Sequence, residues 1–221
     1  MKVLVISVHP DDETLGCGGT LLKHGDQNDE ISWLILTEAS EELGYSQEWI
    51  SKRANQIRDI SQEYQFSKVY NLGFPTTKLH TLDFHELITQ ISSVIQEVEP
   101  EIIYTVNRSD IHTDHQVAAK AITSCTKSFR NPFIKRILMY ECISETEMAP
   151  PLPENMFFTH VYSDISEFLE RKLEIMKIYE SEVQETPLPR SIDNVRALAQ
   201  FRGAAVSVKY AEAFMLIREL F

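Results

Sequence analysis

The stretch that decides the fold is residues 3–13, VLVISVHPDDE, in which an apolar run leads directly into ionisable side chains. The run at 3–8 has the length and composition of a buried strand. Pro10 fixes its own backbone and favours an extended His9, so we expect the strand to end there. The polar group HPDDE at 9–13 then lies at the carboxyl end of the strand, where open parallel sheets bind ligands.

This polar group has two interpretations. Three carboxylates and one imidazole within five residues would repel one another if buried only for packing, and a cation would stabilise them. A solvated turn and helix cap is the simpler alternative. Residues 110–115, DIHTDH, favour the cation, because they follow another apolar run at 102–106 and begin another helical pattern. Two His/Asp groups at strand ends are what a metal site assembled across neighbouring strands requires.

Apolar runs alternate with amphipathic patterns along the rest of the chain. Further strands are predicted at 31–36, 69–72, 102–106, 137–140 and 157–162. Helices are predicted at 14–24 with Gly25 as C-cap, at 48–65, at 84–98, from His115 to Cys125, and from Asp164 to before Pro187. This alternation predicts an α/β fold, a Rossmann-like three-layer sandwich with a mostly parallel sheet. A length of 221 residues suits a single domain over residues 1–221.

The amino-acid composition limits the kinds of molecule that the protein is expected to bind and its expected location. The net charge is −12 and no basic run occurs, which disfavours nucleic acid. No apolar stretch of about 20 residues occurs, so we expect no membrane segment. Three cysteines give neither an even disulfide framework nor a paired zinc spacing, which indicates a reducing, cytoplasmic location. The number of subunits stays open, a homo-oligomer included.

The glycines at 16–19, GCGG, invite comparison with nucleotide-binding loops. Position 21 is Leu where the dinucleotide fingerprint has its third glycine, and no phosphate-loop lysine follows. We expect instead that these glycines let the helix start approach the metal and the substrate closely. Cys17 is interpreted as a small apolar side chain, because nitrogen and oxygen donors nearby already make a full ligand set.

The two polar groups offer more donors than one zinc needs. A catalytic zinc uses three protein ligands and leaves one position for water. Sequence spacing alone does not show which three of these donors bind the metal. If the chain becomes helical after Pro10, His9 and Asp12 are three residues apart and face the same point, which favours that pair.

These motifs resemble the PIG-L/LmbE-like zinc-dependent N-deacetylases. The resemblance rests on HPDDE at 9–13, GCGGT at 16–20 and HTDH at 112–115. Weaker matches extend it over nearly the whole chain, through LGF at 72–74, RG at 202–203 and YAEAF at 210–214. The resemblance implies that His9, Asp12 and His115 are the metal ligands and that Asp11 is the general base.

Other site residues follow from the same resemblance. It implies that His112 stabilises the oxyanion or protonates the leaving amine, with Asp114 favouring the charged imidazole. Glu13 is expected to orient a ligand or cap the helix. Arg53 resembles an arginine that reaches the sugar, although a solvated helix cation is the alternative interpretation. Thr76 stands where family members often carry a sugar-binding Asp, which departs from the pattern.

The resemblance implies a zinc-dependent hydrolase that removes the N-acetyl group from an N-acetylglucosamine-type derivative and releases acetate and a free amine. The partner would be a small acetamido-sugar substrate. The expected cofactor is Zn²⁺, with another divalent transition metal such as Fe²⁺ as the alternative. The competing hypothesis is a metal-binding regulatory protein of the same fold without turnover.

Overall fold

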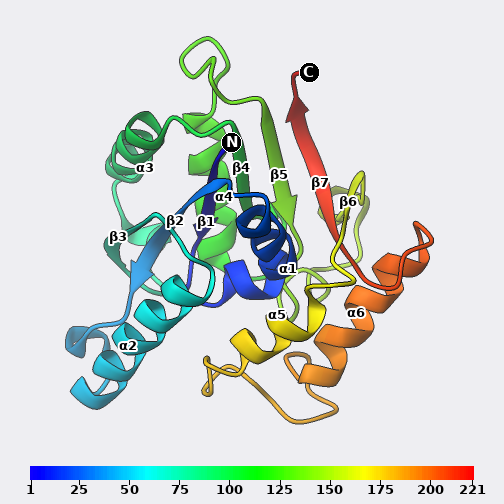
Figure 1. Ribbon diagram of the computed structural model, residues 1–221. Coiled ribbons are helices and arrows are strands. Elements are labelled where there is room, and N and C mark those ends of the chain that lie inside the picture. Colours follow the sequence, from blue (N-terminus) through cyan, green and yellow to red (C-terminus); the bar gives the residue numbers. More distant parts are fainter.

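The computed structural model describes all 221 residues and contains one seven-stranded sheet of order β3-β2-β1-β4-β5-β7-β6 (Figure 1). Its strands are β1 (Lys2–Ser7), β2 (Glu30–Glu38), β3 (Lys68–Pro75), β4 (Ile102–Val106), β5 (Arg136–Tyr140), β6 (Val161–Asp164) and β7 (Ala211–Glu219). Strands β1 to β5 pair in parallel, whereas β7 is antiparallel to both β5 and β6. The sheet is therefore mixed but mostly parallel, as predicted.

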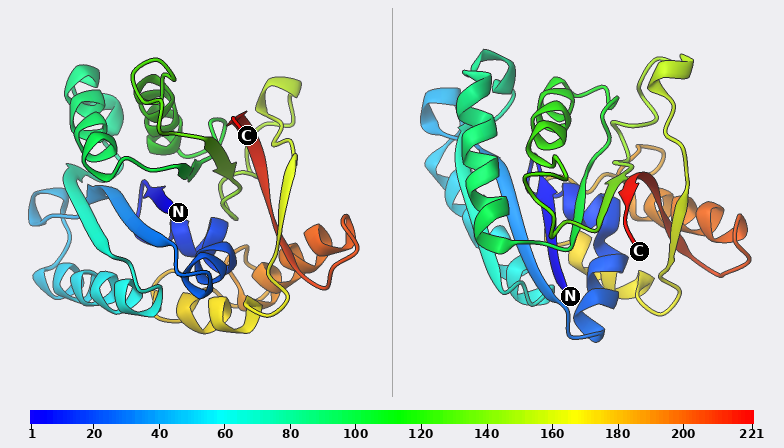
Figure 2. Two further views of the ribbon diagram at one scale, coloured as in Figure 1. Left: turned by 45° about the horizontal axis from the view of Figure 1, so that its top comes forward. Right: turned by 90° about the horizontal axis from the view of Figure 1, so that it is seen from above.

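Helices cover both faces of the sheet and make three layers, which the left view of Figure 2 shows edge-on. The helices are α1 (Asp12–Asp26), α2 (Gln47–Glu63), α3 (Phe84–Val98), α4 (Thr113–Cys125), α5 (Leu169–Met176) and α6 (Ile192–Ala204). Helices α3 and α4 lie together on one face, and α1, α2, α5 and α6 lie on the other. This confirms the predicted α/β sandwich.

Strand β1 is an interior strand of the sheet, between β2 and β4. Residues 3–6 have no exposed surface. A strand covered by helices on both faces needs apolar residues at every position, which explains why this run does not alternate. The same burial fixes where the polar group at 9–13 emerges.

The C-terminal part of the chain differs from the prediction in several places. Strand β7 and helix α6 were not predicted. The sixth strand is Val161–Asp164, and not 157–162. Helix α5 begins at Leu169, after a turn, and ends at Met176. Helix α1 runs through Gly25 to Asp26, so Gly25 is not the C-cap.

The glycines of α1 also have a different use from the one expected. An added Cβ would lie 2.1 Å from the Tyr140 ring at Gly16 and 2.8 Å from the Ile165 side chain at Gly19. Neither glycine lines the pocket described below. They are required for packing of α1 against β5 and the segment before α5, rather than for an approach to substrate.

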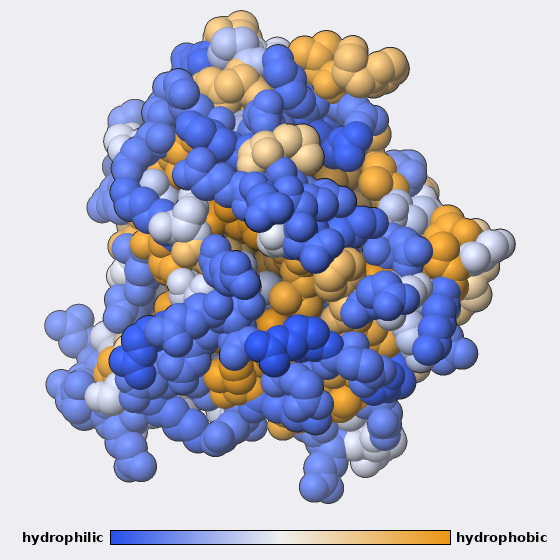
Figure 3. Space-filling view, in the orientation of Figure 1, coloured by the Kyte–Doolittle hydropathy of each residue, from blue (hydrophilic) through white to orange (hydrophobic).

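No helix is long and apolar enough to cross a membrane. The face shown in Figure 3 is largely hydrophilic, with apolar residues exposed only in small groups. This agrees with the excess of acidic over basic residues.

Candidate active site

The strand order reverses between β1 and β4, since β2 and β3 continue on one side and β5 on the other. The loops that follow two such neighbouring strands diverge and leave a crevice. Residues 9–13 follow β1 and residues 107–112 follow β4, so both polar groups lie beside this crevice. The fold therefore joins two segments about a hundred positions apart.

Three side chains meet there at short distances. His9 Nδ1 lies 3.3 Å from His115 Nε2, which lies 3.4 Å from Asp12 Oδ1. His9 Nδ1 is 3.9 Å from Asp12 Oδ2. Asp12 and His115 are buried, and His9 closes the group on the solvent side with 20% of its side chain exposed.

This group fits a divalent cation. Zinc bound tetrahedrally by ligand atoms at about 2.0–2.1 Å holds those atoms about 3.3 Å apart, close to the spacing of these donors. The other nitrogen of His9, Nε2, is buried and lies 3.4 Å from Asp114 Oδ2, without forming a hydrogen bond. The two imidazoles and the carboxylate lie close together but do not use all their donor and acceptor atoms on one another. They form a ligand set for a divalent transition metal.

A second group, His9 with His112 and Asp114, is a poorer metal site. Both oxygens of Asp114 are already engaged, because they accept hydrogen bonds from the backbone N–H groups of Thr77 at 2.6 Å and Leu79 at 3.0 Å. Asp114 therefore holds the loop after β3 in place beside the crevice.

Asp110 was not among the predicted site residues, yet it orients His115. Its Oδ2 lies 2.9 Å from Nδ1 of His115, and its Oδ1 accepts hydrogen bonds from Asn107 and Thr146. A carboxylate behind a metal-binding imidazole fixes the tautomer and leaves Nε2 free for the ion. The signal was present in the sequence, since Asp110 stands five residues before His115.

Charge around the ligands favours cation binding. Burial alone would lower the pKa of His115, but Asp12 and Asp110 on its two sides raise that pKa well above the ordinary range. Burial opposes ionisation of Asp12, yet His115 and His9 lower its pKa. The carboxylate of Asp12 also accepts the backbone N–H groups of Val8 and His9. A divalent ion would replace the proton of His115 between two carboxylates.

Asp11 projects into the crevice from an unusual backbone conformation, with φ of 154°. Its backbone N–H donates to Glu13 Oε2 at 3.2 Å, and Glu13 is itself held by Ser7, Thr14 and Tyr179. Burial, followed by the charge of Asp12, raises the pKa of Asp11 well above its usual value. Glu13 therefore acts on the turn that carries Asp11, and does not bond to a ligand side chain.

Arg190 is a second residue that the sequence did not indicate. It comes from the loop between α5 and α6, and its Nη1 donates to Asp11 Oδ2 at 3.1 Å and to Glu182 Oε2 at 2.9 Å. Glu182 also accepts from Arg53, whose other terminal nitrogen donates to Pro10 O at 2.9 Å. Arg53 thus lines the pocket as expected, but it is an ion-paired, buried group and not a solvated helix cation.

The surroundings of His112 oppose a charged ring in the metal-free protein. Burial, followed by the neighbouring His9 and His115, lowers the pKa of His112 to about 4. His112 is also the N-cap of α4, and its Nδ1 accepts the backbone N–H of Asp114 at 3.1 Å. The hydrogen bond at Nδ1 places the proton of the neutral ring on Nε2, and Asp114 is a neighbour that raises the pKa, with less effect than burial.

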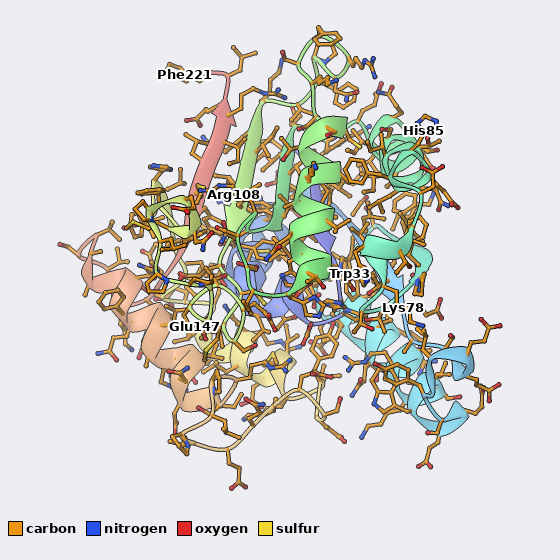
Figure 4. All side chains as sticks on the ribbon, turned by 180° about the vertical axis from the view of Figure 1, so that it is seen from behind. Trp33, Lys78, His85, Arg108, Glu147 and Phe221 are labelled. Atoms are coloured by element: carbon orange, nitrogen blue, oxygen red, sulfur yellow. The ribbon has the colours of Figure 1, made fainter.

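The crevice opens into a pocket of about 370 Å³. The acidic loop at 38–47 contributes Glu38 and Tyr45 to its wall, and Thr76 lies on the wall as well. Cys142 reaches the pocket, whereas Cys17 does not. Of the remaining histidines, His24 is buried and the others are exposed; Figure 4 shows His85 on the outer side of α3.

The fold and this site define an α/β protein with a His/Asp/His group suited to a divalent metal at the switch point of the sheet. Residues 4–126 match the family described as PIG-L: GlcNAc-PI de-N-acetylase. The chain belongs to the PIG-L family.

Curated relatives are deacetylases of acetylated sugars. The chain is 25% identical over 234 residues to the diacetylchitobiose deacetylase of Thermococcus kodakarensis, covering 100% of this chain and 84% of that one. It is 23% identical over 192 residues to the probable N-acetyl-alpha-D-glucosaminyl L-malate deacetylase 2 of Bacillus anthracis, covering 81% and 80%. These relatives indicate a hydrolytic N-deacetylase.

Solved structures share the fold. A conserved protein of Thermus thermophilus superposes with a TM-score of 0.78 at 23% identity, covering 100% of this chain and 96% of that one. A zinc-inhibited form of a teicoplanin deacetylase gives 0.75 at 16%, covering 98% and 97%. The 4-carboxy-2-hydroxymuconate hydratase of Pseudomonas putida gives 0.72 at 15%, covering 100% and 98%. Because a hydratase has this fold too, the fold alone does not define the reaction.

Proposed function

We propose that this protein is a divalent-metal hydrolase that removes the acetyl group from an N-acetylglucosamine-type amino sugar and releases acetate and a free amine. The observation that carries the proposal is the group of His9, Asp12 and His115 beside the buried carboxylate of Asp11, at the base of an open pocket. The proposed substrate class, an acetylated amino sugar, is taken from the deacetylase relatives.

His9, Asp12 and His115 would hold the metal. Zn²⁺ in such a site polarises a carbonyl and lowers the pKa of a water molecule toward about 7. Fe²⁺ is the alternative, because imidazole and carboxylate ligands accept both ions.

Asp11 is the proposed general base. Its carboxylate lines the pocket next to the ligand group, and its raised pKa makes it a better proton acceptor than an ordinary Asp. Glu13 fixes the backbone of Asp11, while Arg190 holds one of its carboxylate oxygens. Asp11 takes the proton of the attacking water and returns it to the amine nitrogen as the amide bond breaks.

His112 is the proposed oxyanion donor. Its Nδ1 is engaged by the backbone of α4, so Nε2 carries the proton and can donate it in a hydrogen bond. A donor fixed before the reaction stabilises the negative oxygen of the tetrahedral intermediate. Asp114 assists by holding the loop at Thr77 and Leu79, and Arg53 forms part of the wall that contacts the sugar.

The alternative function is metal binding without turnover. Thr76 favours it, since this residue stands on the pocket wall where family members often carry a sugar-binding Asp. A shorter hydroxyl side chain makes a weaker contact with a sugar hydroxyl than a carboxylate does.

Acetate release separates these functions. We would incubate the metal-loaded protein with acetamido sugars as free sugars, nucleotide-linked sugars and glycosides, and measure acetate and new primary amine. A hydrolytic deacetylase gives the two products in equal amounts. Stoichiometric metal binding without acetate from any of these compounds would instead support the non-catalytic alternative.

A further inference from the structure

The pocket has an aromatic side wall that the proposed chemistry does not use. Tyr45 follows the short helix η1 (Glu41–Leu43), and Trp49 lies in the first turn of α2. Their ring centroids are 4.7 Å apart, and both rings line the pocket. Ile50 and Ala54 continue the wall along α2.

Internal packing does not account for this pair. Tyr45 and Trp49 are only partly buried and do not pack against the hydrophobic core, whereas Ile57, two turns further along α2, does. Two adjacent, partly exposed aromatic rings on a pocket wall form an apolar surface that a ligand can contact. Each ring also carries a polar group, the Tyr45 hydroxyl or the Trp49 indole N–H, suited to a sugar hydroxyl.

The pair is linked to the metal-binding turn through Arg53. The guanidinium carbon of Arg53 lies 4.9 Å from the centroid of the Trp49 ring, and its Nη1 donates to Pro10 O at 2.9 Å. Pro10 directly follows the ligand His9. The aromatic wall and the His/Asp/His group therefore line one pocket, with Arg53 in contact with both Trp49 and Pro10.

Charge in the pocket indicates what kind of substituent fits. Five carboxylates line the pocket, from Asp11, Asp12, Glu38, Glu145 and Glu182. Its two guanidinium groups, those of the arginines already described, are both paired with carboxylates. An anionic substituent would find no free cation there, so an uncharged group is favoured.

We infer that Tyr45 and Trp49 form a subsite for an uncharged second sugar ring joined to the acetamido sugar. The C–H face of a pyranose carries partial positive charge and stacks on the negative face of an aromatic ring. This inference rests on the proposed function for the reacting end of the substrate. It assigns the preferred substrate to neutral disaccharides, and not to free monosaccharides or sugars with an acidic substituent.

Kinetic preference tests the subsite. The ratio of kcat/KM for N,N′-diacetylchitobiose to that for N-acetylglucosamine should fall by about tenfold in Trp49→Ala, as expected for the loss of one stacking ring. Trp49→Phe keeps an aromatic face and should restore most of the ratio. Phe129→Ala, which removes a ring that is 78% exposed and outside the pocket, is the matched control and should leave the ratio unchanged.

Fluorescence gives a readout that needs no turnover. The chain has two tryptophans, and Trp33 is fully buried in the interior (Figure 4), so a sugar-dependent change reports Trp49. In the Asp11→Asn protein, N,N′-diacetylchitobiose should alter the emission more strongly and at lower concentration than N-acetylglucosamine or N-acetylglucosaminyl malate. The change should disappear in Asp11→Asn/Trp49→Phe.

The outcomes separate the two proposals. A Trp49-dependent signal without acetate release would contradict the proposed function and support the subsite. Deacetylation with the same substrate ratio in Trp49→Ala as in wild type, or tighter binding of the malate derivative, would overturn the subsite and leave the deacetylase activity standing.

Discussion

Two buried polar clusters contact α1, one at its first residue and one near its kink, and they differ in how completely their groups are paired. At the start of the helix, His9, Asp12 and His115 approach one another, but His9 Nε2 forms no hydrogen bond and its contact with Asp114 Oδ2 is 3.4 Å long. Behind the helix, Lys172 donates to Glu212 at 2.7 Å and to Leu15 O at 2.9 Å.

The second cluster is saturated. Glu212 also accepts the backbone N–H groups of Gly19 and Thr20, where α1 is kinked at Cys17. These donors begin the second part of the helix, so the carboxylate caps it from β7. A closed cluster of this kind holds elements together, whereas the open cluster at the pocket is built for a ligand. Burial of charge alone does not distinguish the two; the unpaired atoms and the adjoining cavity do.

The largest effect is expected for Asp11→Asn, which should impair catalysis without a matching loss of stability. General base catalysis supplies about 10²- to 10⁴-fold in rate, or roughly 3–5 kcal/mol, and kcat should fall by this amount. Metal content should stay near that of wild type, because Asp11 is not in the ligand group. Steady-state kinetics and metal analysis on the same preparation would check this, and near-normal kcat in Asp11→Asn would remove Asp11 from the mechanism.

Replacing Lys172 by Met should instead lower stability and leave the site unaffected. Removing one partner of a buried ion pair leaves the other charge uncompensated, which costs about 3–5 kcal/mol in the free energy of unfolding. The folded fraction should still bind metal normally. Lys52→Met, which breaks an exposed ion pair with Glu180, is the matched control and should change the unfolding free energy by less than about 1 kcal/mol. Equal losses in the two variants, measured by urea unfolding, would show that the Lys172 cluster is not structural.

The pH dependence of metal stabilisation is a smaller effect with a definite sign. The pKa of His115 is raised in the folded metal-free protein, so its proton stabilises the fold fully below about pH 6.5, and this contribution is lost as pH rises through the folded pKa. Zn²⁺ replaces that proton. The stabilisation by Zn²⁺ should therefore increase from pH 6 to pH 8.5, by up to about 1.4 kcal/mol per pH unit.

Thermal unfolding with and without Zn²⁺ would measure this. His85→Ala, on the exposed side of α3, should show the same increase as wild type. A zinc-induced gain that stays constant with pH would contradict a proton-competing imidazole ligand.

The open cluster could be predicted from the sequence because its information is local. An apolar run that ends in HPDDE at 9–13, and a second that leads to DIHTDH at 110–115, each mark a strand end, and parallel strands place such ends at one edge. The sheet order then brings His9 and His115 within 3.3 Å.

The remaining features of the site and fold depend on long-range contacts, which no local sequence pattern indicates. Arg190 reaches Asp11 across 179 positions, and Glu212 reaches α1 from β7 across 193 positions. The lowered pKa of His112 follows from its burial and from the neighbouring His9 and His115, which only the folded chain brings together. Strand β7 was missed because charged residues at both ends, such as Glu212 and Arg218, obscure its apolar middle.

Calorimetric titration of the metal-free protein with Zn²⁺ tests the central claim most directly. Wild type and Lys172→Met should each bind one ion per chain at the open cluster, with release of protons. His9→Ala removes the ligand that has the fewest protein partners and should lose this binding event while keeping its far-ultraviolet circular dichroism. A His9→Ala protein that still binds one Zn²⁺ with wild-type affinity would contradict the assignment of the site.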